Sequence, residues 1–111
     1  MLVGYSSHGP GILANDKPDI AAYTHFLGSE AFGQGTPDSG TSTACPVAAG
    51  VVAALRSAFP FDPADPNRTP ANVRNFVLNS AVHPTAPGGW TADFGRGIID
   101  TVNFVNAAGA L

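Results

Sequence analysis

The sequence predicts an α/β fold, and three segments carry that prediction. Residues 42–59 contain no charged side chain before Arg56 and are apolar on every side, which is typical of a helix buried within a larger structure. Residues 19–22 form a short apolar run without alternation, as expected for a strand covered on both faces. Residues 70–80 repeat apolar side chains with the period of an amphipathic helix. A buried strand beside such helices indicates the α/β class.

The first forty residues are predicted to form short strands separated by turns. We expect a strand at residues 2–6, followed by a loop over a stretch rich in glycine, proline and asparagine that lasts to residue 17. After the buried strand, residues 24–27 and 31–36 are expected to pair as a loose hairpin. The hairpin ends in the Gly35–Gly40 loop, which leads into the apolar helix.

Proline and threonine mark the ends of the first two helices. Pro46 is tolerated only within the first turn of a helix, where its missing N–H has no intrahelical role, so the first N-cap is expected near Thr43. Pro60 ends this helix. Thr69 followed by Pro70 is the pattern of an N-cap with proline at the first helical position, and it begins the amphipathic helix.

The C-terminal segment is predicted to contain a short strand and a last helix. The strand is expected at residues 97–99. The helix is expected over residues 102–108, with Asp100 or Thr101 as its N-cap and Gly109 closing it.

Composition and charge limit the partners of the chain. The 111 residues suit one compact domain, but only 12% are charged, about half the usual share, so the chain has little charged surface for a free-standing domain. Five basic residues against eight acidic ones give a net charge of −3, and the basic residues are scattered singly. We therefore expect neither nucleic acid nor a membrane surface as a partner. The longest apolar run, Val47–Leu55, is too short to span a membrane, and nothing resembles a signal peptide.

Few residues other than serine suggest a reactive or metal-binding site. Cys45 is the single cysteine, which excludes an intrachain disulfide and a cysteine-based zinc site, and its thiol is expected to point into the packed helix. Asp62, Asp65 and Asn67 could be read as calcium ligands, but the neighbouring prolines and the Thr69 cap favour turn formers. We therefore expect no metal site in this chain.

Ser42 is the strongest candidate for chemistry. With the N-cap near Thr43, Ser42 is expected just outside the helix, after the flexible Ser39-Gly40-Thr41 segment. Its hydroxyl would be free to project, and its N–H would be among the unpaired donors at the positive end of the helix dipole. A serine so placed is suited to acyl transfer, because helix amides can stabilise a developing oxyanion. The alternative is that Ser42 is one more residue that caps the helix.

Four segments resemble motifs of the subtilisin-like serine peptidases. Residues 40–50, Gly-Thr-Ser-Thr-Ala-Cys-Pro-Val-Ala-Ala-Gly, closely resemble the active-site serine motif of that family, usually Gly-Thr-Ser-Met-Ala-x-Pro-His-Val-Ala-Gly. Residues 5–10, 17–22 and 94–100 resemble three further landmarks, in the order in which the family has them. Together these segments cover nearly the whole chain.

The resemblance implies a fold and a role for the site residues. It implies the C-terminal part of a three-layer α/β/α sandwich with a parallel central sheet, over residues 1–111. Ser42 matches the nucleophile, and its own N–H matches the backbone half of the oxyanion hole. Gly40, Thr41 and Thr43 lie beside it in the motif, and Thr43 stands where the family usually has methionine. The leaving-group side of the site is therefore expected to be smaller and less sensitive to oxidation.

Two other departures from the family pattern affect packing and conformation. Val47 stands where the motif has a histidine that is not the catalytic base, so this change concerns packing. Tyr23 and Thr24 replace the usual Pro-Gly after the buried strand, which leaves the conformation of residues 23–39 open.

The rest of the catalytic triad is expected outside this chain. In the subtilisin order, Asp and His precede Ser, with the His about 150 residues upstream, whereas 41 residues precede Ser42. The triad Asp, the His and the side-chain oxyanion donor are therefore expected in an N-terminal part that this chain lacks. His8, His25 and His83 are more simply read as surface or turn residues. We predict that the isolated chain is inactive, because a serine hydroxyl without a base is a poor nucleophile.

The resemblance implies a serine endopeptidase of which this chain supplies the nucleophile. The implied partners are a polypeptide substrate and either the missing N-terminal part or a second copy that covers an exposed core face. No organic cofactor is implied, although structural calcium is possible in the full domain, and the family resemblance places the protein outside the cell. The alternative function is a non-catalytic module, a truncated or degenerate peptidase kept for binding or assembly.

Overall fold

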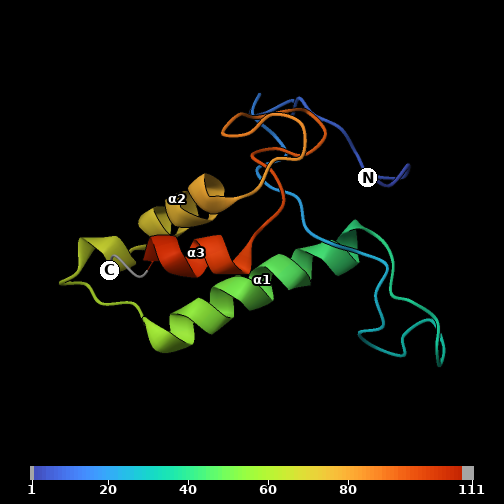
Figure 1. Ribbon diagram of the computed structural model, residues 1–111, viewed down its shortest axis with the longest axis horizontal. Coiled ribbons are helices and arrows are strands. Elements are labelled where there is room, and N and C mark those ends of the chain that lie inside the picture. Colours follow the sequence, from blue (N-terminus) through green and yellow to red (C-terminus); the bar gives the residue numbers. More distant parts are fainter. Residues whose placement is uncertain (1, 109–111) are drawn as a thin grey trace.

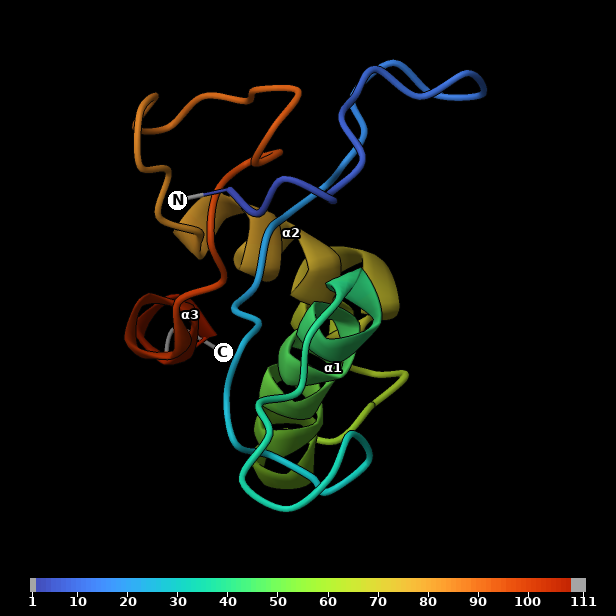
Figure 2. The same ribbon diagram turned by 90° about the vertical axis from the view of Figure 1, so that its right-hand side faces the viewer.

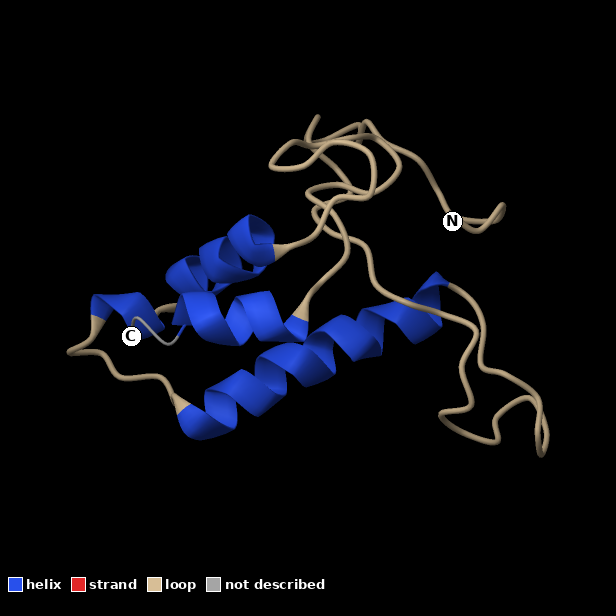
Figure 3. Cartoon of the chain, viewed as in Figure 1, coloured by secondary structure: helices blue, strands red, loops and turns tan. Residues whose placement is uncertain are grey.

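The computed structural model describes residues 2–108, whose regular elements are helical. Figure 1 shows α2 and α3 side by side, with the longer α1 passing along them, and Figure 2 shows the same arrangement after a 90° turn. Long loops make up most of the remaining chain (Figure 3). No helix among the described residues is long and apolar enough to cross a membrane. The elements are α1 (Thr41–Ala58), the 3-10 turn η1 (Pro66–Arg68), α2 (Pro70–Ser80) and α3 (Thr101–Ala108).

The helix predictions are largely confirmed. The amphipathic helix has the bounds predicted for it, and the Thr69 hydroxyl accepts a hydrogen bond from the Asn72 N–H at 3.3 Å, as an N-cap does. The last helix begins one residue earlier than predicted, and the Asp100 carboxylate caps it by accepting from the Asn103 N–H at 2.7 Å. The predicted closing residue, Gly109, lies outside the described residues.

The predicted strands are reduced to single bridges. Within residues 2–108 the backbone forms four isolated bridges and no continuous strand. Ile98 lies at the centre of two of them, parallel to Ala21 and antiparallel to Val82. The segments predicted as strands at 19–22 and 97–99 therefore do lie side by side, but each pairs at one position only. Three segments that pair at one residue each are too few and too short to form a sheet that is stable in water, which agrees with the short pairing.

The predictions for residues 2–6 and for the hairpin are wrong. Residues 2–6 form a turn, in which the Ser6 N–H donates to the Val3 carbonyl at 3.1 Å. Phe26 pairs with Asp38, which lies beyond the predicted second strand. The reason is the Asp38 side chain, which accepts from the Ser29 N–H at 2.7 Å and from the Ser29 hydroxyl at 2.9 Å. These bonds hold the intervening residues in turns instead of a ladder.

The hydrophobic core lies where α2, α3 and the second half of α1 meet. Phe104 of α3 is fully buried, and around it are four more buried side chains. Those four are Leu55, Val73, Val77 and Ile99. Leu55 is the one α1 residue that is buried, so the expectation of a helix buried on every side is wrong for this structure. The core elements approach α1 from one side, and the opposite side of the helix stays exposed.

Candidate active site

Ser42 lies in the first turn of α1, as its second residue. The helix begins at Thr41, and Gly40 is its N-cap, without a side-chain cap. The predicted N-cap near Thr43, with Ser42 outside the helix, is therefore wrong. Pro46 lies deeper in the helix than a first-turn proline. Because proline has no N–H, the Ser42 carbonyl lacks the helical hydrogen bond that residue 46 would otherwise donate.

Gly40 sets the start of α1 through its backbone. Its φ of 102° lies in a region that side chains rarely adopt and glycine adopts freely. The Gly40 carbonyl accepts from the Thr43 N–H at 3.0 Å and also from the Thr24 hydroxyl at 3.1 Å. The Gly40 N–H donates to the Tyr5 hydroxyl at 2.8 Å. Two side chains distant in sequence, Tyr5 and Thr24, thus hold the residue that begins the helix.

Tyr5 and Thr24 are residues that sequence reasoning did not identify as part of the site. Tyr5 appeared as a member of a motif, and Thr24 as a departure from one, without a role for either hydroxyl. No local signal connects them to residue 40, because the contacts join segments that lie 35 and 16 residues apart. On the helix itself, the Thr43 hydroxyl donates to the Ser39 carbonyl at 2.8 Å, which further ties the first turn to the loop before it.

The polar groups of Ser42 are available to a ligand. Its side chain is exposed, and within residues 2–108 neither its hydroxyl nor its backbone N–H has a hydrogen-bond partner. The first turn of α1 contains no acidic residue, so no side-chain charge opposes the positive end of the helix dipole there. A ligand oxygen that acquires negative charge beside the Ser42 N–H would therefore be stabilised by that donor and by the helix dipole.

The three histidines are engaged elsewhere in the part of the chain that the structure describes. The ring of His8 contacts the Asp93 carboxylate, with Nδ1 and Oδ1 2.5 Å apart, and both side chains are about half exposed. His25 is exposed and stacks on Tyr5, with ring centroids 6.0 Å apart. None of the three histidines hydrogen bonds to Ser42.

His83 is a turn residue, as predicted, but it is buried. Its Nδ1 accepts from the backbone N–H groups of Thr85 and Ala86, and its Nε2 lies 2.9 Å from the Thr91 hydroxyl. Because Nδ1 accepts from both N–H groups, the ring is the tautomer with its proton on Nε2. Both ring nitrogens of His83 are therefore engaged in hydrogen bonds within the loop that contains it.

An open apolar groove of about 1000 Å³ begins at the N-terminal end of α1. Small side chains of α1, including Ala44, Cys45 and Ala48, form one wall, and residues 18–25 form the other, with Ile98 and Ile99 at its floor. Figure 2 shows the backbone of residues 18–25 running beside α1. Cys45 is exposed in this groove, so the prediction that its thiol points into a packed helix is wrong.

The residues considered as calcium ligands form turns. The Asp62 carboxylate accepts from the Ala64 N–H at 2.9 Å, and the Asp65 carboxylate accepts from the Asn67 N–H at 2.9 Å while it pairs with Arg68. These are the bonds by which aspartate stabilises a turn and caps a 3-10 helix. Among the described residues, no group of three or more His, Cys, Asp or Glu side chains is placed to hold a metal ion.

The comparisons with known proteins define the family of the chain. Residues 1–97 match the model of the subtilase family, Peptidase_S8, and the chain belongs to that family. The chain is also 34% identical over 102 residues to a subtilisin-like protease of Arabidopsis thaliana, SBT5.1, in an alignment that covers 78% of this chain and 12% of that protein. The chain thus spans a small share of the length of this relative. No solved structure matches the chain significantly. The α/β class predicted from the sequence is the class of the family.

Proposed function

We propose that this chain is the C-terminal part of a subtilase catalytic domain and that Ser42 is its nucleophile. The observation that carries the proposal is the exposed N-terminus of α1, where the Ser42 hydroxyl and N–H have no partner among residues 2–108. Membership of the subtilase family supports hydrolysis of peptide bonds as the reaction. The same membership supports a three-layer α/β/α sandwich for the whole domain and a location outside the cell.

The proposed reaction combines the groups of the first turn of α1 with a histidine supplied by the N-terminal part of the domain. A histidine from the N-terminal part takes the proton from the Ser42 hydroxyl as its oxygen attacks the scissile carbonyl. The carbonyl oxygen becomes negatively charged beside the Ser42 N–H, and the histidine then gives its proton to the leaving amine. Water hydrolyses the acyl-serine in a second, equivalent cycle. Gly40 and Thr41 lie on the approach to the serine, and Thr43 follows it.

The groove supports the N-terminal part of the domain as the missing partner. Its walls are mostly apolar, it includes Thr41, one residue from the proposed nucleophile, and it is bordered by segments that pair at a single bridge. Additional strands would extend that pairing and cover the exposed face of α1. Burial of this apolar surface would provide the association free energy at about 25 cal/mol per Å².

A second candidate function is a non-catalytic module. It is favoured by one observation: among the described residues no histidine or carboxylate hydrogen bonds to Ser42. A module kept for binding or assembly needs no such partner, whereas the peptidase needs both groups to converge on the hydroxyl. The two functions therefore differ in what happens when a triad-bearing segment is supplied.

Reconstitution tests the peptidase proposal. We would co-express the chain with the segment of a subtilase domain that carries Asp and His, and measure cleavage of a fluorogenic peptide and labelling by a fluorophosphonate. We expect cleavage and labelling from the pair, and neither from the chain alone. Ser42→Ala should abolish both, while Ser57→Ala, at the far end of the same helix, should preserve them. Labelling of the chain alone would contradict the incomplete triad, and activity retained by Ser42→Ala would contradict the assignment of the nucleophile.

A further inference from the structure

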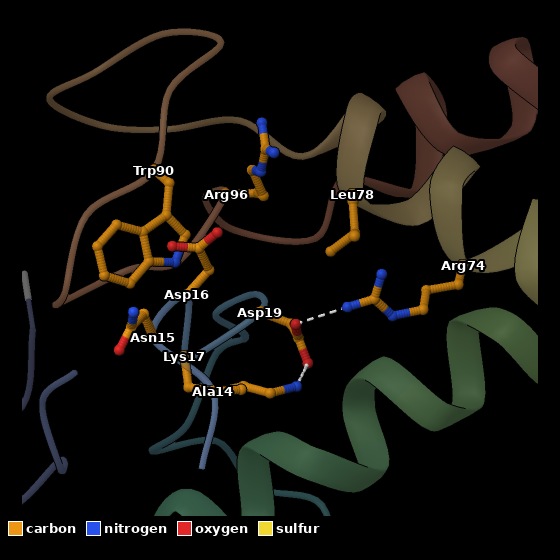
Figure 4. Close-up of a pocket in the computed structure, with 9 residues that line it drawn as sticks. All are labelled: Ala14, Asn15, Asp16, Lys17, Asp19, Arg74, Leu78, Trp90 and Arg96. Atoms are coloured by element: carbon orange, nitrogen blue, oxygen red, sulfur yellow. Dashed lines mark hydrogen bonds and ion pairs between the residues drawn. The ribbon is translucent and has the colours of Figure 1, made fainter. Parts of the chain in front are cut away.

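A second cavity, of about 380 Å³, lies apart from Ser42 and shares Asp19 with the groove. It is open to solvent and is lined by residues 14–17, by Asp19, by α2 and by the loop over residues 90–96, and Figure 4 shows the side chains that line it. No residue of α1 contributes to its lining. The side chains on which the argument rests are Asp16, Lys17, Asp19, Arg74, Trp90 and Arg96.

Positive charge is concentrated in this cavity. The chain is acidic overall and has five basic residues, yet three of them, Lys17, Arg74 and Arg96, line this one space. The other two are engaged elsewhere: Arg56 donates to the Arg68 carbonyl and Arg68 pairs with a carboxylate. Because basic residues are otherwise sparse, their convergence here distinguishes this cavity from the rest of the described surface.

Two of the cations share a single carboxylate. The Lys17 ammonium lies 2.6 Å from one oxygen of Asp19, and the Arg74 guanidinium lies 2.7 Å from the other, as Figure 4 shows. Burial by itself would raise the pKa of Asp19, but the hydrogen bonds and charges of Lys17 and Arg74 outweigh it and lower that pKa below its ordinary value. Asp19 is therefore ionised at neutral pH and compensates one of the two cations.

The backbone of Arg96 is fixed by its neighbours, whereas its side chain is unpaired within residues 2–108. Its N–H donates to the Asp19 carbonyl at 2.8 Å. The glycines on either side of it have positive φ, and a Cβ on Gly95 would lie 2.4 Å from the Asp19 carbonyl oxygen, so this turn is tightly packed. The side chain itself is exposed and has no hydrogen bond or ion pair within residues 2–108. Its guanidinium therefore has all its donors available to a ligand.

Asp16 and Trp90 complete the lining. The Asp16 carboxylate also lines the cavity, so the cavity contains three cations and two carboxylates and has one cation in excess. The indole N–H of Trp90 donates to the Pro18 carbonyl at 2.9 Å. This bond fixes the ring as a wall and leaves no indole donor for a ligand. The cavity thus combines a fixed aromatic wall with cationic donors, at a volume within the range of small-molecule sites.

We propose that this cavity binds a small oxyanion, a phosphate or carboxylate group, through the Arg96 guanidinium, with Lys17 and Arg74 lining the same space. Guanidinium groups bind both kinds of oxyanion by paired N–H donors, and the positive excess favours an anion over water. The Asp16 carboxylate opposes large polyanions and so favours a small ligand of low charge. The site is independent of Ser42, and its test does not depend on the proposed peptidase function.

The single tryptophan of the chain provides a direct signal for binding, because Trp90 lines the cavity. We would titrate the chain with inorganic phosphate and, separately, with acetate, at ionic strength held constant with chloride, and follow the emission of Trp90. We expect a saturable change with at least one of the two anions, and the tighter one identifies the class. In Arg96→Gln the half-saturating concentration should rise about tenfold, which corresponds to loss of a charge-assisted hydrogen bond. Arg96→Lys should fall between the two.

A matched variant separates the site from general electrostatics. Gln34→Glu lowers the net charge by the same amount as Arg96→Gln but lies in an exposed loop that does not line the cavity. Its titration should equal that of the unaltered chain, and far-UV circular dichroism should show equal helix content in all variants. The proposal is overturned if chloride alone reproduces the response, if neither anion gives saturation, or if Arg96→Gln titrates like the unaltered chain.

Discussion

The two ends of α1 differ in a way that its sequence does not reveal. At the C-terminal end, Leu55 is 5% exposed and packs with Phe104, which is fully buried, in the core formed with α2 and α3. At the N-terminal end, Ser42 and Cys45 are exposed, and the small side chains of the helix line an open groove. The helix carries no charged side chain before Arg56 at either end, so charge alone does not separate a packed end from an open one. What differs is which part of the described chain reaches each end.

This difference suggests that one end of α1 stabilises the fold and the other end carries the proposed site. The packed end consists of α2, α3 and the second half of α1, whose buried side chains contact one another within the described chain. The open end carries the proposed nucleophile and presents apolar surface that a further part of the domain would cover. Stability and function are therefore expected to respond to different residues, and substitutions can test that separation.

The largest expected effect comes from removing the centre of the packed end. Phe104→Ala deletes a fully buried ring and should lower the free energy of unfolding by about 3–5 kcal/mol, the range for a buried phenylalanine. Tyr23→Ala removes an aromatic ring that lines the groove and is 66% exposed, so it should change that free energy by less than about 0.5 kcal/mol. Urea unfolding followed by circular dichroism measures both. Equal losses in the two variants would show that the groove is as tightly packed as the core.

A smaller effect on the free energy of unfolding is expected from alanine substitutions at two glycines, one in a tightly packed turn and one in an open turn. Gly95 and Gly88 both have positive φ, 59° and 72°, but a Cβ on Gly95 would meet the Asp19 carbonyl oxygen at 2.4 Å, whereas a Cβ on Gly88 would meet nothing within 4 Å. Gly88→Ala should therefore cost about 1 kcal/mol from backbone strain alone. Gly95→Ala should cost roughly 2 kcal/mol or more, because it adds a clash with the backbone. If thermal unfolding shows equal costs, the close approach of this turn to Asp19 is not a constraint.

The sequence predicts the packed end well because its signals are local. The helix over residues 70–80 has its predicted bounds, since Thr69, Pro70 and the apolar period all lie within the helix or next to it. The start of α1 differs from the prediction because it depends on Gly40, which is held by Tyr5 and Thr24 from distant segments. The strands were overpredicted for the same reason, because a strand pairs only where a neighbouring segment extends alongside it.

The geometry around the candidate site could not be predicted from the sequence, and the role of Ser42 stays a prediction. The motif around Ser42 identified the serine and its neighbours. Its position in the first turn, and the exposure of Cys45 in a groove, depend on which elements pack against α1. The sequence pattern does not predict the second cavity either, because the three basic residues that line it, Lys17, Arg74 and Arg96, come from separate segments. Convergence of distant residues is the feature that sequence patterns describe least well.

The smallest expected effect concerns the pH dependence of the ion pairs at Asp19. Because the pKa of Asp19 is lower in the folded chain than its ordinary value of about 3.9, the unfolded state binds more protons as the pH falls toward that value. The stabilisation is therefore present above about pH 4 and is lost as the pH falls through the lower, folded pKa. The Asp19 side chain is 34% exposed, so screening keeps the contribution of its ion pairs to the free energy of unfolding below about 1 kcal/mol.

Asp19→Asn should reduce the acid-dependent loss of stability between pH 6 and pH 3 measured by urea unfolding. Asp16→Asn, which removes a carboxylate of the same cavity that has no ion pair within residues 2–108, is the matched control. A loss of acid dependence as large in Asp16→Asn as in Asp19→Asn would contradict a specific contribution from the two ion pairs of Asp19.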